Sequence, residues 1–386
     1  MPYINAIGTA TPPHCLPQTR IAQFMADALQ LQDHDRRRLM ALHRATGIHQ
    51  RYSVLADYGT NNGNFLFFPN TPDLEPFPSV ATRMQAYHQH AAPLAARAVD
   101  RCLQQYPDFD LNGVTHLITV SCTGMYAPGL DIELVEMLGL KTHVQRTAIN
   151  FMGCYGAFNG MKLADTICRA DPDAKVLLIC VELCSLHFQK SLAEDHLLSN
   201  ALFADGAAAV VVEAQPREGI ALQMSSFYCD LVLAGKREMA WHIADFGFEM
   251  TLSAYVPDLI EKGIRQLIAR LLQNTGLEME AIDHFAIHPG GRRILEVIEK
   301  QLGLTSQDNR YAYGVLQQYG NMSSPTVLFV LAAVWKDLTE AHARRNILSC
   351  AFGPGLTLES MVLEVVANQS ETSKFAEVRD YQDLAR

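Results

Sequence analysis

One cysteine of this chain, Cys154, has sequence surroundings typical of a reactive nucleophile. A short apolar segment ends at Gly153-Cys154, and apolar residues then recur at helical spacing through Ala157, Phe158 and Met161. This pattern predicts a tight turn at the N-terminus of a buried helix. Because such a terminus carries partial positive charge, it should lower the thiol pKa below its ordinary value of about 8.5. The alternative is a buried structural thiol, which is how many free cysteines behave.

Two further residues, His288 and Asn321, fall where an apolar segment ends in a turn. His288 precedes Pro-Gly-Gly, and Asn321 follows a glycine and precedes an apolar helical segment. Ligands of open α/β sheets bind at such strand ends. Taken alone, His288 could be a core residue and Asn321 a helix N-cap. Together with Cys154 they could supply a thiolate, a proton acceptor and two N–H donors for an oxyanion.

The elements that must position these residues alternate between strand and helix, as in a parallel α/β sheet. We expect a first half, residues 1–220, that carries Cys154, and a second half, residues 221–370, that carries His288 and Asn321. A polar tail, 371–386, follows. The expected strands are 116–120, 145–149, 175–182, 207–212, 219–228, 284–287, 346–350 and 358–366, and the main helices are 82–105, 131–138, 154–168, 252–275, 292–302 and 322–337.

Composition narrows the class of protein. The 386 residues, 49% hydrophobic and 19% charged, can form two domain-sized halves, and a net charge of −10 argues against a general nucleic-acid binder. Nine cysteines without paired spacing and an N-terminus without a signal peptide predict reduced thiols and a cytoplasmic location. No apolar stretch reaches the roughly 20 residues of a membrane span. Cys180 and Cys184 lack further ligands at suitable spacing, so we expect no metal site.

Five motifs, taken together, resemble those of a known family. They are Asn150-Phe-Met-Gly-Cys154-Tyr-Gly-Ala, Phe203-Ala-Asp-Gly-Ala, Ile287-His288-Pro-Gly-Gly, Tyr319-Gly-Asn321-Met-Ser-Ser-Pro and Phe352-Gly-Pro-Gly-Leu-Thr. Their order and approximate spacing are similar to those of the type III polyketide synthases, the chalcone synthase-like branch of the thiolase superfamily, from about residue 3 to residue 366. The resemblance implies the thiolase fold, a duplicated αβαβα five-layer sandwich, and a homodimer.

The resemblance also implies a chemistry for the motif residues. Cys154 would take an acyl group from a coenzyme A thioester. Malonyl-CoA would then lose carbon dioxide, its enolate held by His288 and Asn321, and would condense with the acyl group. Phe203 corresponds to a gatekeeper whose apolar ring favours loss of the carboxylate, although it could equally be a core residue. Coenzyme A thioesters are then substrates, and no resident cofactor is expected.

For coenzyme A, the resemblance implies a tunnel bordered by Gly290 with basic residues near the phosphates. The candidates are Arg38, Arg44, Arg292 and Arg293. The alternative for the arginine-rich segment around Arg38 is a solvated helix face.

The positions implied to line the acyl cavity suggest the product. They are Cys122, Thr123, Cys184, His187, Trp241, Met250 and Ser323. The arrangement Ser-Cys-Thr-Gly at 121–124 is similar to that of microbial members, including those that accept fatty acyl starters. Trp241 takes a position that is glycine in chalcone synthases and adds about 200 Å² of side-chain surface. We therefore expect an aliphatic starter and an alkylresorcinol or alkylpyrone, unless Trp241 packs elsewhere. Ala351 replaces a common glycine and either adopts a β-like backbone or shifts a loop.

Three other functions share parts of this pattern. A ketoacyl carrier-protein synthase of the fatty-acid-initiating kind also uses Cys, His and Asn, and an acyl carrier protein could likewise deliver the starter. A non-catalytic partner subunit would keep the fold, although the three residues are intact here. A cysteine hydrolase would use the same groups on an amide or ester.

Overall fold

In the computed structural model, which describes residues 1–60 and 63–368, nine strands form one continuous sheet in the order β11-β12-β13-β8-β1-β7-β6-β4-β5. One half contains β1 (Tyr3–Ala10), β4 (His116–Ser121), β5 (Gln145–Asn150), β6 (Lys175–Leu183) and β7 (Asp205–Glu213). The other contains β8 (Gly219–Leu231), β11 (Ile282–Ile287), β12 (Asn346–Gly353) and β13 (Thr357–Asn368). The halves join where Tyr3 pairs with Gln223 and Ile4 with Leu222.

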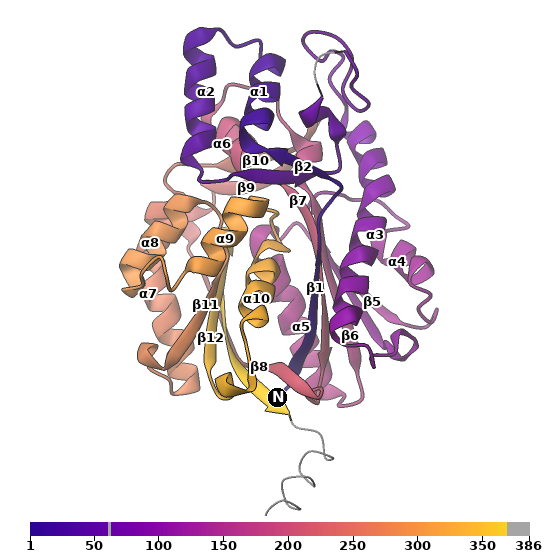
Figure 1. Ribbon diagram of the computed structural model, residues 1–386, viewed down its shortest axis with the longest axis vertical. Coiled ribbons are helices and arrows are strands. Elements are labelled where there is room, and N and C mark those ends of the chain that lie inside the picture. The colour runs from indigo at the N-terminus through magenta and orange to yellow at the C-terminus, as the bar shows by residue number, and fades with distance from the viewer. Residues whose placement is uncertain (61–62, 369–386) are drawn as a thin grey trace, which may run out of the picture.

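Helices separate and cover the two half-sheets in five layers (Figure 1). The middle layer is α5 (Gly156–Ala170) and α10 (Thr326–Lys336). One outer layer is α3 (Val80–Gln105) and α4 (Leu130–Met137), and the other is α7 (Val256–Thr275) and α8 (Arg292–Leu302), with α9 (Arg310–Tyr319) beside α8. The predicted fold class, α/β with layers in αβαβα order, is confirmed.

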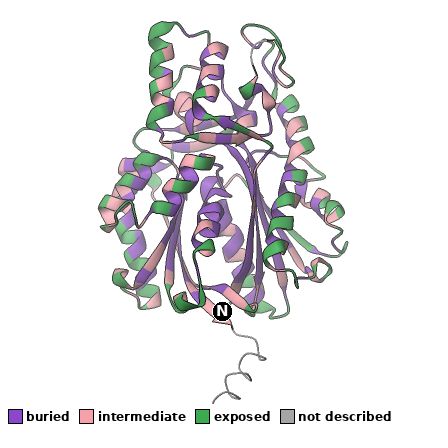
Figure 2. Ribbon diagram, viewed as in Figure 1, coloured by how far each residue is buried: buried purple, intermediate pink, exposed green. Residues whose placement is uncertain are grey.

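The layers follow from the alternation of side chains along the strands. In β6, Leu177 and Ile179 face the core under α3, whereas Val176 and Leu178 face the core around α5. Successive residues of a strand point to opposite faces, so a strand that is apolar at every position must be covered on both. Figure 2 shows the result: most strands and the middle helices are buried, the edge strand β5 is exposed, and the outer helices expose their outward faces.

A cap lies over one end of the half-sheets, at the top of Figure 1. It consists of α1 (Gln18–Ala28), α2 (Asp33–Ala45), α6 (Glu194–Leu202), the antiparallel strand pair β2–β3 (His14–Pro17 and Gln50–Ser53) and the hairpin β9–β10 (Met239–Ala244 and Gly247–Leu252). Aromatic contacts of Phe24 with Tyr58, Phe68 and Phe188, at centroid distances of 4.8 to 6.1 Å, hold α1 in place.

Three details differ from the prediction. The sheet is mixed rather than parallel: β7 runs antiparallel to β6 because α6, between them in sequence, belongs to the cap and does not cross the sheet face. The expected helix 252–275 begins only at Val256, after the unpredicted hairpin β9–β10. The helix expected from 322 begins at Thr326, because Ser323 has a φ of +58° and cannot continue a right-handed helix.

The structure does not test two of the expected boundaries. The division at residue 220, which lies within β8, stays a prediction. The polar tail 371–386 lies outside the described residues.

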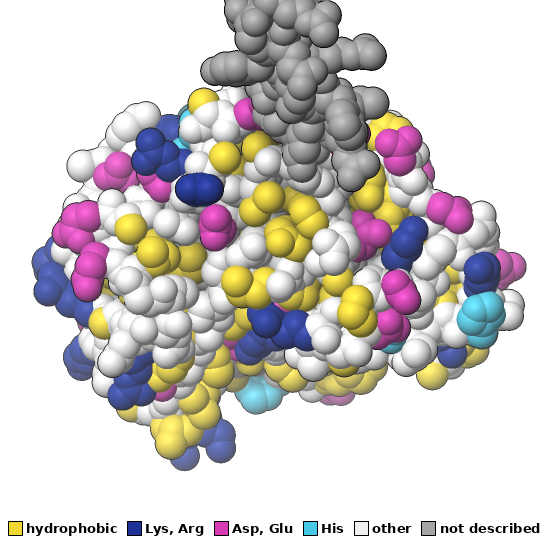
Figure 3. All heavy atoms as spheres, turned by 90° about the horizontal axis from the view of Figure 1, so that it is seen from below, with side chains coloured by type: hydrophobic (Ala, Val, Ile, Leu, Met, Phe, Trp, Pro, Cys, Tyr) yellow, Lys and Arg dark blue, Asp and Glu magenta, His cyan; other side chains and the backbone are white. Residues whose placement is uncertain are grey.

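The surface carries charged side chains of both signs. Acidic and basic side chains are both present on the face seen in Figure 3. Within residues 1–60 and 63–368, no helix is long and apolar enough to cross a membrane.

A glycine contact between α3 and β1 gives a test of the packing. A Cβ at Gly8 would lie 2.1 Å from Ala98 O and Cys102 N, both backbone atoms that cannot rotate away. We expect Gly8→Ala to lower the free energy of unfolding by about 3 kcal/mol, measured by urea titration. Gly314→Ala in α9, where no atom lies within 4 Å of the new methyl, should raise it by about 0.5 kcal/mol. Equal midpoints for both variants would contradict this packing.

Candidate active site

Cys154 lies on a turn built from glycine contacts. It belongs to a short 3-10 segment, Gly153–Tyr155, that leads directly into α5. Gly153 has a φ of +76°, and a Cβ there would lie 2.4 Å from Pro354 Cδ. A Cβ at Gly353 would lie 2.5 Å from the Tyr155 ring. The turn before α5 and the turn after β12 therefore pack tightly, each glycine against a side chain of the other turn, and Cys154 is only 5% exposed.

That burial makes the expected lowering of the thiol pKa wrong for the protein without ligand. Burial raises the pKa of Cys154 to about 12, and the hydrogen bonds from Ser323 and Asn321 offset it only in part. Desolvation disfavours the charged thiolate more than the helix N-terminus favours it. Cys154 is therefore a neutral thiol that needs a proton acceptor at the moment of attack.

His288 follows β11 and is buried to 1% exposure. Its backbone N–H donates to Cys350 O at 2.8 Å, which holds it against β12. Among the described residues neither ring nitrogen has a hydrogen-bond partner, and burial lowers the pKa of the ring to about 3. A Cβ at Gly290 would lie 3.8 Å from Nε2, so this glycine leaves space beside the nitrogen. A buried imidazole without a partner is costly unless a ligand supplies one.

Asn321 connects the other two residues. Its Nδ2 lies 3.9 Å from Cys154 Sγ and donates to Gly290 O at 3.2 Å. Its Oδ1 accepts from Ser323 N–H at 2.8 Å, which fixes the direction of the amide. Asn321 is not the N-cap of α10, a position taken by Pro325. The structure thus brings Cys154 of the first half into contact with Asn321 of the second, with the Gly290 backbone between Asn321 and His288.

Phe203 is placed by the backbone of Asn321. Asn321 N–H donates to Leu202 O at 3.0 Å, and Ala204 N–H donates to Asn321 O at 2.8 Å, which forms a parallel bridge. Phe203 lines the main cavity beside this bridge. Its predicted gatekeeper role stays a prediction.

The cavity that Phe203 lines, called the main cavity here although others in the described residues are larger, lies under the cap. It contains about 580 Å³ of empty space, part of it open to solvent, and Cys154, His288 and Asn321 do not line it. Four predicted lining residues border it: Cys184, His187, Trp241 and Met250. Trp241 and Met250 face each other across the hairpin β9–β10, and Trp241 Nε1 donates to Cys122 O at 2.7 Å. The unpredicted hairpin therefore carries the indole into the cavity wall.

His187 is part of that wall and is fully hydrogen-bonded. Its Nε2 donates to Thr123 O at 2.7 Å, and its Nδ1 accepts from Phe248 N–H at 3.0 Å. The two bonds fix one neutral tautomer, and burial lowers its pKa to about 3. The ring stacks on Phe248 at 4.4 Å. His187 therefore shapes the cavity and has no free nitrogen for proton transfer.

The other three predicted lining residues lie deeper than the main cavity. Cys122 Sγ accepts from Gly153 N–H at 3.0 Å, and Thr123 Oγ1 donates to the carboxyl of Glu182 at 2.9 Å. Ser323 is hydrogen-bonded to the Cys154 thiol. Cys122 and Ser323 therefore lie beside the nucleophile and Thr123 lies beside Glu182. None of the three borders the main cavity.

Glu182 is the buried polar group that the sequence interpretation missed. It is fully buried in β6, where its Oε2 accepts from Cys122 N–H and Thr123 Oγ1, each at 2.9 Å, and its Oε1 accepts from Ser324 Oγ at 2.7 Å. Burial raises its pKa to about 7. The available signal was a single carboxylate inside an otherwise apolar strand.

Arg51 was also missed. Its buried guanidinium donates to Gln18 Oε1, Asn200 O and Phe203 O. It thereby holds the end of α6 and the carbonyl of Phe203 against the cavity.

The predicted coenzyme A residues fall on neighbouring cavities. Gly290, Arg292 and Arg293 line one cavity together with Leu42 and Leu198. Arg38 lines an adjoining one that shares Leu42 and Leu198. Arg292 and Arg293 are exposed and paired with Glu296 and Asp258. Arg44 is an exposed residue in the last turn of α2 and lines neither of these two cavities.

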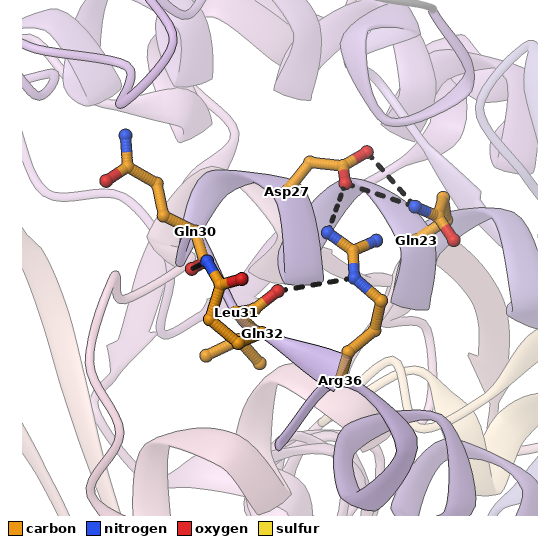
Figure 4. A network of polar contacts seen from close by, with 6 residues as sticks. All are labelled: Gln23, Asp27, Gln30, Leu31, Gln32 and Arg36. Atoms are coloured by element: carbon orange, nitrogen blue, oxygen red, sulfur yellow. Dashed lines mark hydrogen bonds and ion pairs between the residues drawn. The ribbon is translucent and has the colours of Figure 1, made fainter. Parts of the chain in front are cut away.

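The position of α2 depends on a different arginine of the same run (Figure 4). Arg36 donates to Asp27 Oδ1 at 2.7 Å and to Leu31 O at 3.4 Å, and Gln23 donates to the same carboxylate. This network ties the start of α2 to the end of α1. Arg36 is therefore occupied, whereas the exposed Arg38 lines the cavity together with Asp35, with which it pairs at 4.0 Å.

No metal site accompanies these groups in the described residues: no cluster of three His, Cys, Asp or Glu side chains there could hold an ion.

Comparison with known proteins defines the class. The model of the N-terminal domain of chalcone and stilbene synthases matches residues 2–216, and that of the C-terminal domain matches residues 223–367. The chain belongs to this family, and the predicted assignment to the type III polyketide synthases, which are acyltransferases, is confirmed.

Individual relatives agree. The chain is 29% identical to the Mycobacterium tuberculosis protein "Alpha-pyrone synthesis polyketide synthase-like Pks18", over 94% of this chain and 91% of that one. It is 31% identical to "Type III polyketide synthase A" of Arabidopsis thaliana, over 93% and 91%. The crystal structure of PKS-I from the brown alga Ectocarpus siliculosus superposes with a TM-score of 0.87 and 29% identity, over 95% and 98% of the two chains. The thiolase fold is thereby confirmed.

The pKa of Glu182 gives a pH test of the site. A folded-state pKa raised above the unfolded one contributes stability at low pH that is lost as pH rises through about 7. Glu182→Gln removes this loss. From about pH 5 to about pH 8, the free energy of unfolding of the parent should fall by about 2 kcal/mol more than that of the variant. Urea titrations at both pH values measure it, and Asp205, also raised by burial, cancels because it titrates in both proteins. Parallel pH curves would contradict the burial of the carboxyl.

Proposed function

We propose that the protein condenses an aliphatic acyl-CoA starter with malonyl-CoA and cyclises the product to an alkylpyrone or alkylresorcinol. The observation that carries the chemistry is the contact between the Cys154 thiol and the Asn321 amide, 3.9 Å apart. The same amide donates to Gly290 O, beside the buried His288 ring whose nitrogens have no partner among the described residues. A nucleophile, a proton acceptor and an oxyanion donor are what acyl transfer requires.

In the proposed loading step, the Cys154 thiol attacks the carbonyl carbon of the starter thioester. His288 accepts the thiol proton and passes it to the leaving coenzyme A sulfur. Because the neutral thiol and the neutral imidazole are both favoured by burial, the charge pair exists only during the transfer.

In the proposed extension step, malonyl-CoA loses carbon dioxide and the electron pair forms an enolate. A ring N–H of His288 and Nδ2–H of Asn321 would hold the enolate oxygen, since the amide is already turned toward Cys154. The half-buried ring of Phe203 would solvate the malonyl carboxylate poorly and so favour its loss.

The aliphatic starter is supported by the cavity wall. Trp241 and Met250 occupy it, and the indole is fixed by its bond to Cys122 O, so little width is left for an aromatic starter. A relative named for alpha-pyrone synthesis supports the pyrone over the resorcinol. Ala351 has no effect on this wall through a loop shift, because it continues β12 as the partner of Glu359.

Coenzyme A would enter by the cavity of Gly290, Arg292 and Arg293, with Arg38 farther along the same groove. The arginines would exchange their exposed carboxylate partners for phosphate, which binds arginine bidentately. Arg44, a homodimer, a cytoplasmic location, the absence of a resident cofactor and carrier-protein delivery of starters stay predictions from the sequence. Family membership disfavours the ketoacyl carrier-protein synthase.

The activity is tested by mass spectrometry of products formed from labelled malonyl-CoA and a panel of acyl-CoA starters. Condensed products should rise with alkyl starters and be absent with Cys154→Ala, whereas Cys15→Ala, an exposed thiol in β2, should behave as the parent. Hydrolysis without condensation would overturn the proposal in favour of a hydrolase, and no turnover of any thioester would favour a non-catalytic subunit.

Starter width is tested at Trp241. Trp241→Gly should shift the preference toward aromatic acyl-CoA starters, with kcat/KM for these rising about tenfold or more because a half-buried indole is removed from the cavity wall. Ile243→Gly, on the same strand with an exposed side chain, controls for the effect of glycine on β9. An unchanged preference in Trp241→Gly would show that the indole does not limit the cavity.

A further inference from the structure

Each extension cycle proposed above consumes one proton inside a buried site. The malonyl carboxylate leaves as carbon dioxide, the new C–C bond forms, and the C–S bond to Cys154 breaks with its electron pair left on sulfur. The next loading step releases coenzyme A as a thiol. One negative charge therefore disappears in each cycle, and one proton must enter from outside. Loading alone needs none, because the thiol proton of Cys154 ends on coenzyme A.

A line of hydroxyl groups leads from α3 to Glu182 in β6. Tyr87 O–H, on α3, donates to Ser121 Oγ at 2.7 Å, and Ser121 Oγ donates to Glu182 Oε2 at 3.5 Å. Both donors are oriented toward the carboxyl, so a proton can pass inward along them. Tyr87 is 1% exposed and Ser121 is 4% exposed. The mechanism derived above uses none of these three groups.

The outer end of this line reaches a separate cavity. Tyr87 and Ser121 both line it, together with the loop from Gly124 to Ile132 and the exposed strand β5. The loop is held on the ring of Tyr87, since a Cβ at Gly124 would lie 2.2 Å from it. Tyr87 is therefore the group of this line through which water in the cavity would supply protons.

The inner end lies beside the nucleophile. Glu182 contacts the thiol of Cys122, whose Sγ accepts from Gly153 N–H at 3.0 Å, next to Cys154. The titratable groups that face Glu182 are Cys122, Cys154, Cys180, Cys184 and Tyr87.

We propose that Tyr87, Ser121 and Glu182 form a proton relay that protonates the Cys154 thiolate released by each condensation. The relay rests on the proposed function. Glu182 gives its proton by way of the Cys122 thiol and regains one from Ser121, which regains one from Tyr87 and then from water. The carboxyl is suited to this exchange because burial raises its pKa to about 7, so that it is both protonated and ionised near neutral pH.

The test compares two steps in Tyr87→Phe and Ser121→Ala. Acylation of Cys154 by a starter alone, followed by intact-protein mass, should keep the rate of the parent because it takes up no proton. Steady-state condensation should fall about tenfold or more in kcat, with KM unchanged and a larger solvent deuterium isotope effect. Tyr311→Phe removes the hydroxyl of another tyrosine, on α9 and bonded to Asp337 at the end of α10, and should match the parent in both steps.

Two results would overturn the relay. One is condensation by both variants within twofold of the rate of Tyr311→Phe. The other is an equal slowing of acylation and condensation with an unchanged isotope effect, which would mean that the hydroxyl groups only support the fold. In either case the parent still forms condensed product, so only the relay fails. If the proposed function itself were wrong, the parent would form no condensed product.

Discussion

The structure depends on placing polar groups between two half-sheets where little water reaches them. Cys154 and His288 are each at most 5% exposed, and Glu182 is fully buried. In such a place a charge is costly and an unpaired donor or acceptor is costly too. Almost every polar group of the site is accordingly paired: Asn321 with Ser323 and Gly290, and Glu182 with Cys122, Thr123 and Ser324. Among the described residues of the site, both nitrogens of the His288 ring and Nη2 of Arg51 have no partner.

The same burial changes what the helix N-terminus does. A terminus next to Cys154 should favour a thiolate, yet desolvation raises the pKa of the thiol to about 12. The loss of hydration outweighs a partial charge of about half a unit. A resting site of neutral groups is compatible with acyl transfer, because the proton need move only between sulfur and imidazole. The proton that each extension cycle consumes must then come from outside the site.

The half-sheets position the reactive residues, and the cap forms the cavity. The half-sheets hold Cys154, His288 and Asn321 at the ends of buried elements, where the glycine contacts of the 153 and 353 turns leave no space for movement. The cap supplies the cavity, through Trp241 and Met250 on β9–β10 and through α2, whose start is tied to α1 by Arg36 and Asp27. Reaction type and substrate width therefore rest on different parts of the chain.

The sequence by itself determined the layered α/β fold, because strands that are apolar at every position require cover on both faces, and it determined the motif residues, because glycine turns before and after them are local features. Only the tertiary structure decided the contact between Cys154 and Asn321, which are 167 positions apart. It also decided the state of the thiol, since desolvation depends on every layer around it. The hairpin β9–β10 is a local element, with its turn at residues 245–246, and was missed all the same. The partners of Glu182 escaped the sequence interpretation because they are defined by what packs against that side chain and not by local spacing.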